Sequence, residues 1–319
     1  MARRLLGWWR MVHRTLALVP ALLTLVAAAP AQAAPIWFWE DDAHTTTFVT
    51  TPTGMHGAAC PIDGNSRADI YWWGNNANPR AWFGQANKTF TSTTLPFLAA
   101  GTITTGLAGD FDDDGDCDLL LYREFGLSEI IAWRDAGSWV TELVEAPDGR
   151  RPFVYESGGY AHIFWYGPGA TGDEIWHPEP RNGAIGATFE VEPWAVTGDY
   201  IPFVGDFDGD FEQDIFWHGP GPDKPDFLWW KDGVGDSPTD FTSVSYSVFN
   251  AYVPVAGEFG YSLFDDEILW YRPGSATDFL WVFDGDRSAV SFDEVAGGAF
   301  VPFAGDFDGN GDEDIVWGS

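Results

Sequence analysis

The fold is decided by the stretch GDFDGNGDEDIVW, residues 305–317, near the end of the 319-residue chain. Oxygen-bearing side chains stand at every second position, 306, 308 and 310, and one more follows at 314. Gly309 and Gly311 permit a tightly coiled backbone, because glycine adopts left-handed dihedral angles at no steric cost. A short coiled loop with alternating Asp and Asn can surround a hard cation with oxygen atoms. This stretch therefore predicts a cation-binding loop that leads into an apolar strand.

The same pattern occurs twice more, as GDFDGDFEQDIFW at 205–217 and GDFDDDGDCDLLL at 109–121. In each copy the residue that closes the loop also opens an apolar strand, so it marks the repeat. The six markers, separated by 49, 44, 52, 53 and 47 residues, are Asp69, Asp118, His162, Asp214, Glu267 and Asp314. A regular internal period of this length predicts an array of similar units, here six of roughly 47–50 residues each.

Each repeat contains signals for four short strands. One strand precedes the loop, one follows it, and a Gly/Pro turn such as 219–221 comes next. A third, aromatic strand such as 227–230 ends at a tight-hairpin signal, Asp232-Gly233 or Asp284-Gly285. A fourth strand alternates in character over 241–248. Four antiparallel strands per repeat are typical of a propeller blade, so we predict an all-β fold.

The two ends of the chain predict how the ring closes. Residues 35–39 match the third strand of a repeat and 44–49 match the fourth, whereas residues 317–319 stop just after a second strand. Together these half-blades make one complete blade. We therefore predict a six-bladed β-propeller, a single domain over 34–319, whose closure leaves no exposed sheet edge. A seven-bladed ring, an open array and a β-sandwich are the alternatives.

Residues 1–33 have the pattern of a secretory signal peptide. Four arginines lie in the first 14 residues, an apolar run covers 16–29, and 31–33 offers small residues for a signal-peptidase cut. The apolar run is shorter than the roughly 20 residues of a membrane span. We expect a secreted or cell-surface protein with no membrane span after cleavage; an uncleaved anchor is the alternative.

The remaining chain is strongly acidic. Four of the 16 Lys and Arg residues lie in the signal segment, which leaves 12 against 48 Asp and Glu, a net charge of −36. Because phosphate binding needs a basic surface, we expect no nucleic-acid partner. The two cysteines, Cys60 and Cys117, lie in loops of blades that should be neighbours. In an exported protein a disulfide is plausible, and both a bridge and two separate thiols stay open.

At its acidic loops the chain resembles the FG-GAP and VCBS-type repeat propellers, a group that includes the N-terminal propeller of integrin α-chains. The loop of that family reads Asp-x-Asp/Asn-x-Asp/Asn-Gly-x-x-Asp. Residues 110–118 and 306–314 fit this pattern in full, whereas residues 206–214 keep the ligands but have Phe211 in place of glycine. In the first repeat Pro61 replaces the leading Asp, which leaves Asp63, Asn65 and Asp69; the copies near 157–160 and 259–262 have lost the pattern.

The three loops are predicted to bind Ca²⁺. Carboxylates gathered in one loop repel one another without a cation, and hard oxygen ligands favour Ca²⁺ over transition metals. The resemblance implies that the backbone carbonyls of Asp116, Glu212 and Asp312 complete the coordination shells. The full candidate set is Asp110, Asp112, Asp114, Asp116, Asp118, Asp206, Asp208, Asp210, Glu212, Asp214, Asp306, Asp308, Asn310, Asp312 and Asp314. Solvated acidic turns held by Asx-type hydrogen bonds are the alternative.

Tryptophan and histidine give no catalytic signature. One tryptophan recurs per repeat and predicts packing between blades, at Trp72, Trp165, Trp217, Trp270 and Trp317. Candidates for sugar stacking are Trp73, Trp82, Trp133, Trp176, Trp194, Trp229, Trp230 and Trp281. The histidines after the signal segment occupy different places in different repeats and form no known catalytic phrase, at His44, His56, His162, His177 and His218. We assign no catalytic residue and no organic cofactor.

These observations predict an exported, Ca²⁺-stabilised propeller that acts as a non-catalytic binding or adhesion module for a glycan or protein ligand. The alternative is a secreted carbohydrate-active enzyme, a hydrolase or lyase, with its site in the central funnel. A purely structural envelope protein is a third interpretation.

Overall fold

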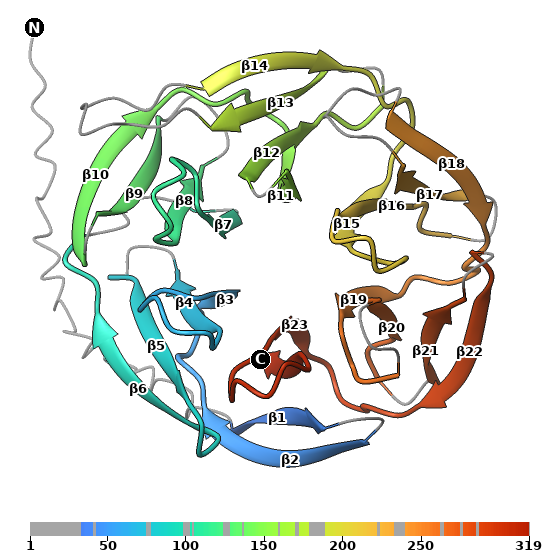
Figure 1. Ribbon diagram of the computed structural model, residues 1–319, viewed down its shortest axis with the longest axis horizontal. Helices are drawn as coiled ribbons and strands as arrows, with labels where there is room; N and C mark the ends of the chain where they lie inside the picture. Colours follow the sequence, from blue (N-terminus) through green and yellow to red (C-terminus); the bar gives the residue numbers. More distant parts are fainter. Residues whose placement is uncertain are drawn as a thin grey trace, which may run out of the picture. The chain divides into compact units, whose positions relative to one another are not determined.

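Short antiparallel strands surround a central axis in the computed structural model (Figure 1). The structure describes residues 33–40, 43–74, 78–97, 103, 105–123, 128–135, 137–158, 160–169, 172–178, 189–221, 224–232, 240–261, 265–274, 277–284 and 287–318. The predicted signal peptide lies outside the described residues apart from Ala33, which begins β1. Gly233 and Gly285 of the predicted hairpin turns also lie outside them. Within the described part of the chain, no helix is long and apolar enough to cross a membrane.

The strands form six sheets of four, which we call blades 1 to 6. Blade 1 contains β3 (His56–Cys60), β4 (Asp69–Trp73), β5 (Arg80–Gln85) and β6 (Thr89–Thr94). Blade 2 contains β7 (Thr105–Gly109), β8 (Asp118–Tyr122), β9 (Glu129–Asp135) and β10 (Ser138–Val144). Blade 3 contains β11 (Arg151–Ser157), β12 (Tyr160–Tyr166), β13 (Asp173–Pro178) and β14 (Phe189–Trp194). Blade 4 contains β15 (Ile201–Gly205), β16 (Asp214–His218), β17 (Asp226–Lys231) and β18 (Phe241–Tyr246). Blade 5 contains β19 (Val253–Gly257), β20 (Glu267–Tyr271), β21 (Asp278–Phe283) and β22 (Ala289–Glu294).

Blade 6 joins the two ends of the propeller domain. Its strand order is β2 (Ala43–Thr50), β1 (Ala33–Glu40), β24 (Asp314–Gly318) and β23 (Val301–Gly305). β1 and β24 are antiparallel, with Ile36 opposite Val316 and Trp37 opposite Ile315. Figure 1 shows the blue strands β1 and β2 beside the red C-terminal segment. The predicted six-bladed closure is confirmed, and the seven-bladed, open and sandwich alternatives are wrong.

The strand registers confirm the repeat markers. Asp214 pairs with Gly205, the last residue of β15, and Asp314 pairs in the same way with Gly305. His162 pairs with Tyr155 at the corresponding place in blade 3. The marker therefore keeps one position in the blade even where its side chain is an imidazole.

The hydrophobic core lies between successive blades. The repeated tryptophans are buried and contact an aromatic ring of the preceding blade edge-on, as Trp217 does with Phe164 and Trp270 with Phe216. Such edge-to-face pairs are a preferred aromatic geometry. Their predicted packing role is confirmed.

Most of the proposed sugar-stacking tryptophans belong to the same core. Five of the eight candidates are buried, so the expectation that these could stack on a sugar is wrong; they are Trp73, Trp133, Trp176, Trp194 and Trp230. Trp82, Trp229 and Trp281 are half-buried. Successive side chains of a strand point to opposite faces of its sheet, so a face that packs against a neighbouring blade buries every second residue. The sequence does not reveal on which face of the sheet a given tryptophan lies.

Candidate metal sites

The three predicted loops bring carboxylates together. Among the described residues, one ligand atom from each member lies within 4.8 Å of the others in three such groups: Asp110, Asp112 and Asp118; Asp206, Asp208 and Asp210; and Asp306, Asp308 and Asp314. A fourth group adds Asp135, the last residue of β9, to Asp112 and Asp114. The sequence analysis missed Asp135, because it lies outside the loop pattern and approaches it only through the sheet.

Backbone N–H groups hold the first acid of each loop. Asp206 Oδ1 accepts hydrogen bonds from the backbone N–H groups of Gly209 and Asp210, at 2.8 and 3.1 Å, and its Oδ2 accepts one from Phe211 at 2.8 Å. Asp306 accepts the same three bonds within its own loop, and Asp110 accepts two of them. The chain therefore coils around this carboxylate, as the alternating pattern predicted.

Phe211 does not disrupt its loop. Its φ of 70° is close to the 87° of Gly115, which fills the same position in blade 2, and its side chain is 80% exposed. A non-glycine residue costs about 1 kcal/mol or more in this region of dihedral space. The loop geometry is thus kept at the expense of local backbone strain.

The marker carboxylate ties each loop to the third strand of its blade. Asp214 Oδ2 accepts a hydrogen bond from Phe207 N–H at 3.0 Å, and its Oδ1 accepts one from Lys231 N–H at 2.7 Å. Asp69 makes the equivalent bonds to Ile62 and Gly84 although its loop is incomplete. The marker aspartates are therefore structural residues, whether or not their loops could bind a cation.

Burial raises the pKa of these marker carboxyls. The pKa of Asp118, Asp214 and Asp314 rises to about 8, chiefly through loss of hydration and partly through the neighbouring loop carboxylates. The pKa of Asp69 rises to about 6, again chiefly through burial. Hydrogen bonds from backbone N–H groups oppose the shift. A nearby cation would favour the ionised form of each marker.

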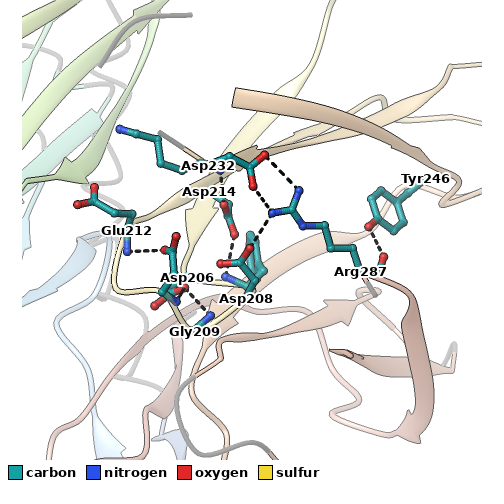
Figure 2. Close-up of polar contacts among 11 residues, drawn as sticks. Asp206, Asp208, Gly209, Glu212, Asp214, Asp232, Tyr246 and Arg287 are labelled. Atoms are coloured by element: carbon teal, nitrogen blue, oxygen red, sulfur yellow. Dashed lines mark hydrogen bonds and ion pairs between the residues drawn. The ribbon is translucent and has the colours of Figure 1, made fainter. Parts of the chain in front are cut away.

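A basic side chain from the next blade reaches two of the loops. Arg287, in the β21–β22 hairpin, contacts Asp208 Oδ2 at 3.0 Å and also bonds Asp232 (Figure 2). Lys88, in the β5–β6 hairpin, lies 3.3 Å from Asp308 Oδ2. Figure 2 shows the Arg287 guanidinium directed between the carboxylates of Asp208 and Asp232. The sequence analysis missed both basic residues, because they belong to a different repeat from the loop that they contact.

The fit of these loops to a cation can be judged from Asp208. Its Oδ2 is held by Arg287, whereas its Oδ1 is buried and makes no hydrogen bond to any described residue. A buried carboxylate oxygen without a donor is costly unless a cation satisfies it. Together with the nearby oxygens of Asp206 and Asp210, it forms an all-oxygen donor set of the kind that Ca²⁺ prefers.

The other candidate ligands have different surroundings. Asn310 Oδ1 accepts a hydrogen bond from Asp312 N–H at 3.0 Å, and its Nδ2 donates to the Trp39 carbonyl at 2.7 Å. The Glu212 side chain points away from its own loop and accepts bonds from Ser157 Oγ and Gly158 N–H in blade 3. In this arrangement the backbone carbonyl of Glu212, and not its side chain, is the group that could serve the loop of blade 4.

The comparisons with known proteins agree with this geometry. A family model described as "FG-GAP-like repeat" matches residues 62–121, which include the complete loop of blade 2. This match and the six four-stranded blades support an FG-GAP/VCBS-type β-propeller.

A solved structure of a protein from Lactobacillus plantarum is similar in fold, with a TM-score of 0.50 and 11% sequence identity over 84% of each chain. No curated protein matches the sequence. The likeness to the solved structure shows the fold alone, so the function of this propeller is argued from its own residues.

The blades of the propeller are tied to one another around its axis. In blade 4 the backbone N–H of Asp206 donates to Asp266 Oδ2 of blade 5 at 2.9 Å, and the Asp266 N–H donates back to the Asp206 carbonyl at 2.6 Å. Glu258 and Glu313 make the same exchange between blades 5 and 6. Gln213 replaces the acid between blades 3 and 4. At these three seams the side chain of the residue before the marker is therefore the tether.

A disulfide crosses the seam between blades 1 and 2. The residue that corresponds to Asp206 is here Pro61, which has no backbone N–H to donate. Cys117, the residue before the marker Asp118, is instead bonded to Cys60, with a Cα–Cα distance of 6.4 Å. The Tyr71 hydroxyl adds a hydrogen bond to the Cys117 carbonyl at 2.8 Å. The bridge that the sequence left open is present.

The tethers line a central cavity of about 410 Å³, together with Cys60, Asp306 and Arg67. Burial raises the pKa of Glu258 and Glu313 to about 7, and it raises the pKa of Asp266 well above its usual range. Asp266 and Glu313 line this cavity, and each is also bonded to the backbone of the preceding blade. The funnel is acidic, and its acids hold the blades together.

A second set of buried carboxylates, missed by the sequence analysis, lies at the start of the third strands. Asp226 Oδ1 accepts a hydrogen bond from Gly219 N–H and its Oδ2 accepts one from Val248 N–H. Asp278 makes the equivalent pair of bonds with Arg272 and Ala296. The repeated phrase Asp-Phe-Leu-Trp at 226–229 and 278–281 was a signal for them. They fasten the turns at the end of the blade opposite to the acidic loops.

Proposed function

We propose that this propeller is an exported, calcium-stabilised binding module for a glycan or protein ligand. The observation that carries the proposal is the convergence of three carboxylates in each of three loops, whose first acid is held by backbone N–H groups. Gathering these charges costs free energy unless a cation compensates them. The buried Asp208 Oδ1 is the clearest acceptor for such a cation.

Calcium suits these loops better than a transition metal. Their donors are carboxylate, amide and carbonyl oxygens, and a loop of this kind supplies many ligands at once. The ion would be held by three acids in each loop: Asp110, Asp112 and Asp118 in blade 2, Asp206, Asp208 and Asp210 in blade 4, and Asp306, Asp308 and Asp314 in blade 6. When bound, Ca²⁺ would supply the positive charge that keeps the buried markers ionised. Its role would be structural, because such a shell leaves no open position for a substrate.

The acids of the central funnel favour binding over catalysis. Asp266 and Glu313 are the tethers between blades, and each already accepts a backbone N–H bond. A general acid or base must be able to exchange a proton with a substrate, and moving these side chains would break the seam. The enzyme interpretation therefore has fewer uncommitted groups to use at this mouth of the channel.

The glycan interpretation is supported by the half-buried tryptophans. Trp229 lines a surface cavity of about 280 Å³ together with Tyr200 and Phe227. Trp82 lines another of similar size with Phe48 and Phe90. Aromatic rings with polar neighbours, such as Thr197 and Ser243 near Trp229, offer both a flat apolar face and hydrogen-bonding groups to a ligand.

Export is supported by the disulfide and by the charge. A bridge between distant residues is typical of an oxidising compartment. A net charge of −32 over the full chain suits a calcium-containing exterior, where bound cations offset part of the repulsion.

A glycan and polysaccharide binding screen, in Ca²⁺ and in excess chelator, tests the proposal. We expect binding that weakens in chelator and leaves the ligand chemically unchanged. Cleaved or eliminated products in any positive well would support the enzyme interpretation instead. If the chelator changes neither the thermal melt nor the binding, the calcium part of the proposal is wrong. Trp229→Ala with Trp281→Ala as its matched control then asks whether the cavity near Tyr200 is the binding site.

A further inference from the structure

The hairpins of blades 1 and 5 each present a basic residue at a left-handed backbone position. Lys88 has a φ of 62° and Arg287 a φ of 65°. In each turn the backbone N–H of the basic residue donates to the carbonyl three residues earlier, that of Gln85 at 2.9 Å and that of Asp284 at 2.8 Å. Glycine is the usual residue at such a position, because a side chain there is sterically disfavoured. Two basic side chains held at this cost in equivalent turns indicate a task for the charged groups.

Arg287 is fixed against blade 4 by several groups (Figure 2). Its guanidinium lies 3.0 Å from Asp208 Oδ2 and also bonds Asp232. The guanidinium carbon, Cζ, lies 4.7 Å from the centre of the Trp230 ring, and the Tyr246 hydroxyl donates to the Arg287 carbonyl at 2.6 Å. The positive charge is therefore held beside the second acid of the acidic loop in the preceding blade.

Lys88 makes the corresponding contacts at the seam between blades 6 and 1. Its Nζ lies 3.3 Å from Asp308 Oδ2 and 5.2 Å from the centre of the Phe38 ring. Phe38 in β1 and Trp230 in β17 hold the same place in the third strands of their blades, as the strand registers show. The same arrangement thus occurs at two seams, with a different basic residue and a different aromatic ring in each.

The hairpin of blade 2 provides the contrast. Its left-handed position is filled by Gly137, with a φ of 82°. The preceding loop, in blade 1, has Pro61 in place of the leading acid and is incomplete. In these three described turns, a basic residue at the left-handed position therefore accompanies a complete acidic loop in the preceding blade, and a glycine accompanies an incomplete one.

We propose that Arg287 and Lys88 are built-in counter-ions of the loops in blades 4 and 6, which weaken Ca²⁺ binding there and stabilise the two seams when Ca²⁺ is absent. This inference rests on the proposed calcium function of the loops. Arg287 contacts Oδ2 of Asp208, whereas Oδ1 is buried and accepts no hydrogen bond from a described residue. One carboxylate can therefore contact the guanidinium and a Ca²⁺ ion together, and the two positive charges then repel each other.

The coupling between the basic residue and the ion must act in both directions. If Arg287 lowers the affinity of its loop for Ca²⁺, then bound Ca²⁺ lowers the contribution of Arg287 to the folded state by the same factor. Calcium affinity and the effect of calcium on stability are thus two independent measurements of one quantity. The second of them needs no bound ligand of the propeller.

Calorimetric titration of the full chain with Ca²⁺ at pH 7.5 gives the first measurement. Arg287→Gly removes the guanidinium and suits the left-handed φ, so the hairpin should stay folded. We expect one site to bind Ca²⁺ roughly tenfold more tightly than in the wild type, because a like charge has been removed. Adding Asp208→Asn should abolish that gain and assign it to the loop of blade 4.

Two further variants complete the titration series. Lys88→Gly should give a gain of the same sign through the loop of blade 6. Arg151→Gln is the matched control: it changes the net charge equally, but in an exposed ion pair with Asp199 outside the loops. Its affinity for Ca²⁺ should equal that of the wild type.

Thermal melts in excess chelator and in millimolar Ca²⁺ give the second measurement. The rise in melting temperature from chelator to Ca²⁺ should be larger in Arg287→Gly and Lys88→Gly than in the wild type, because tighter binding stabilises the folded state further. Comparing the two conditions within one variant cancels the effect of glycine on the backbone.

The outcomes separate this inference from the function on which it rests. Unchanged or weaker Ca²⁺ affinity in Arg287→Gly, with no larger rise in melting temperature, would overturn the inference and leave the calcium function in place. A wild-type chain that binds no Ca²⁺ would overturn the calcium function, and the inference with it.

Discussion

The carboxylate of Glu313 accepts a hydrogen bond from the backbone N–H of Glu258 at 2.8 Å, across the seam between blades 5 and 6. The Glu313 N–H donates to the Glu258 carbonyl at 2.6 Å, so the two residues are joined in both directions. Asp206 and Asp266 repeat the relationship one seam earlier. At these seams the residue before the marker therefore binds the backbone of the preceding blade, and this arrangement gives the first prediction.

Glu313→Gln should preserve stability and Glu313→Ala should reduce it. Gln213 makes the same contact with an amide oxygen at the seam between blades 3 and 4, so the tether needs an acceptor and not a charge. Alanine leaves the Glu258 N–H without its acceptor, at a cost of about 1–3 kcal/mol. Urea denaturation of the two variants and the wild type at pH 8 measures the difference. Equal losses in both variants would show that the charge matters instead.

The disulfide should stabilise the seam between blades 1 and 2, where Pro61 has no backbone N–H to form a tether. Replacing Cys60 and Cys117 together by Ser should lower the free energy of unfolding by about 2–4 kcal/mol, because a cross-link restricts the unfolded chain. The two residues are 57 positions apart, which makes the closed loop long. Denaturation of the oxidised wild type, the reduced wild type and the double variant gives the values. A reduced wild type as stable as the oxidised one would contradict the prediction.

Asp308→Ala should lower the melting temperature in Ca²⁺ more than Asp63→Ala does. Asp308 lies in the complete loop of the blade that closes the ring, whereas Asp63 lies in the incomplete loop of blade 1. A cation site at 100 times its dissociation constant contributes about 2.7 kcal/mol to the folded state.

The control for Asp308→Ala is a second comparison in excess chelator, where the gap between the two variants should shrink. Asp308 also contacts Lys88, so Lys88→Gln in chelator measures the part of the loss that is due to that ion pair. Identical melts for Asp308→Ala and Asp63→Ala in Ca²⁺ would identify the loops as ordinary acidic turns.

In chelator, the stability of the protein should fall as the pH is raised from about 5 to about 8. The pKa values of Asp69, Glu313 and Asp214 are raised by burial, to about 6, 7 and 8. An acid with a raised pKa in the folded state binds more protons there than in the unfolded chain. Raising the pH through this window therefore removes stability.

The matched series for this pH prediction is the same set of urea denaturations in millimolar Ca²⁺. Bound cations would favour the ionised markers, so the decline should be smaller or reversed with the metal present. Stability that rises with pH in chelator would contradict the burial-induced shifts.

The sequence by itself determined the repeat, and with it the fold. The markers from Asp69 to Asp314 recur at a period that one blade requires, and each strand alternates because successive side chains point to opposite faces of a sheet. Closure could be predicted because 35–49 and 301–317 each contain half of the same local pattern. The acids of the loops could also be predicted, because their spacing is a property of one short, continuous segment.

The tertiary structure alone decided which residues meet across the blades. Lys88 and Arg287 reach the loops of a neighbouring blade, and Glu313 joins Glu258 across a seam. The loop acids follow from the local backbone, whose dihedral angles repeat with the sequence. A seam contact depends instead on the rotation between two blades and on the length of the side chain that spans it. Neither quantity leaves a periodic trace in the sequence.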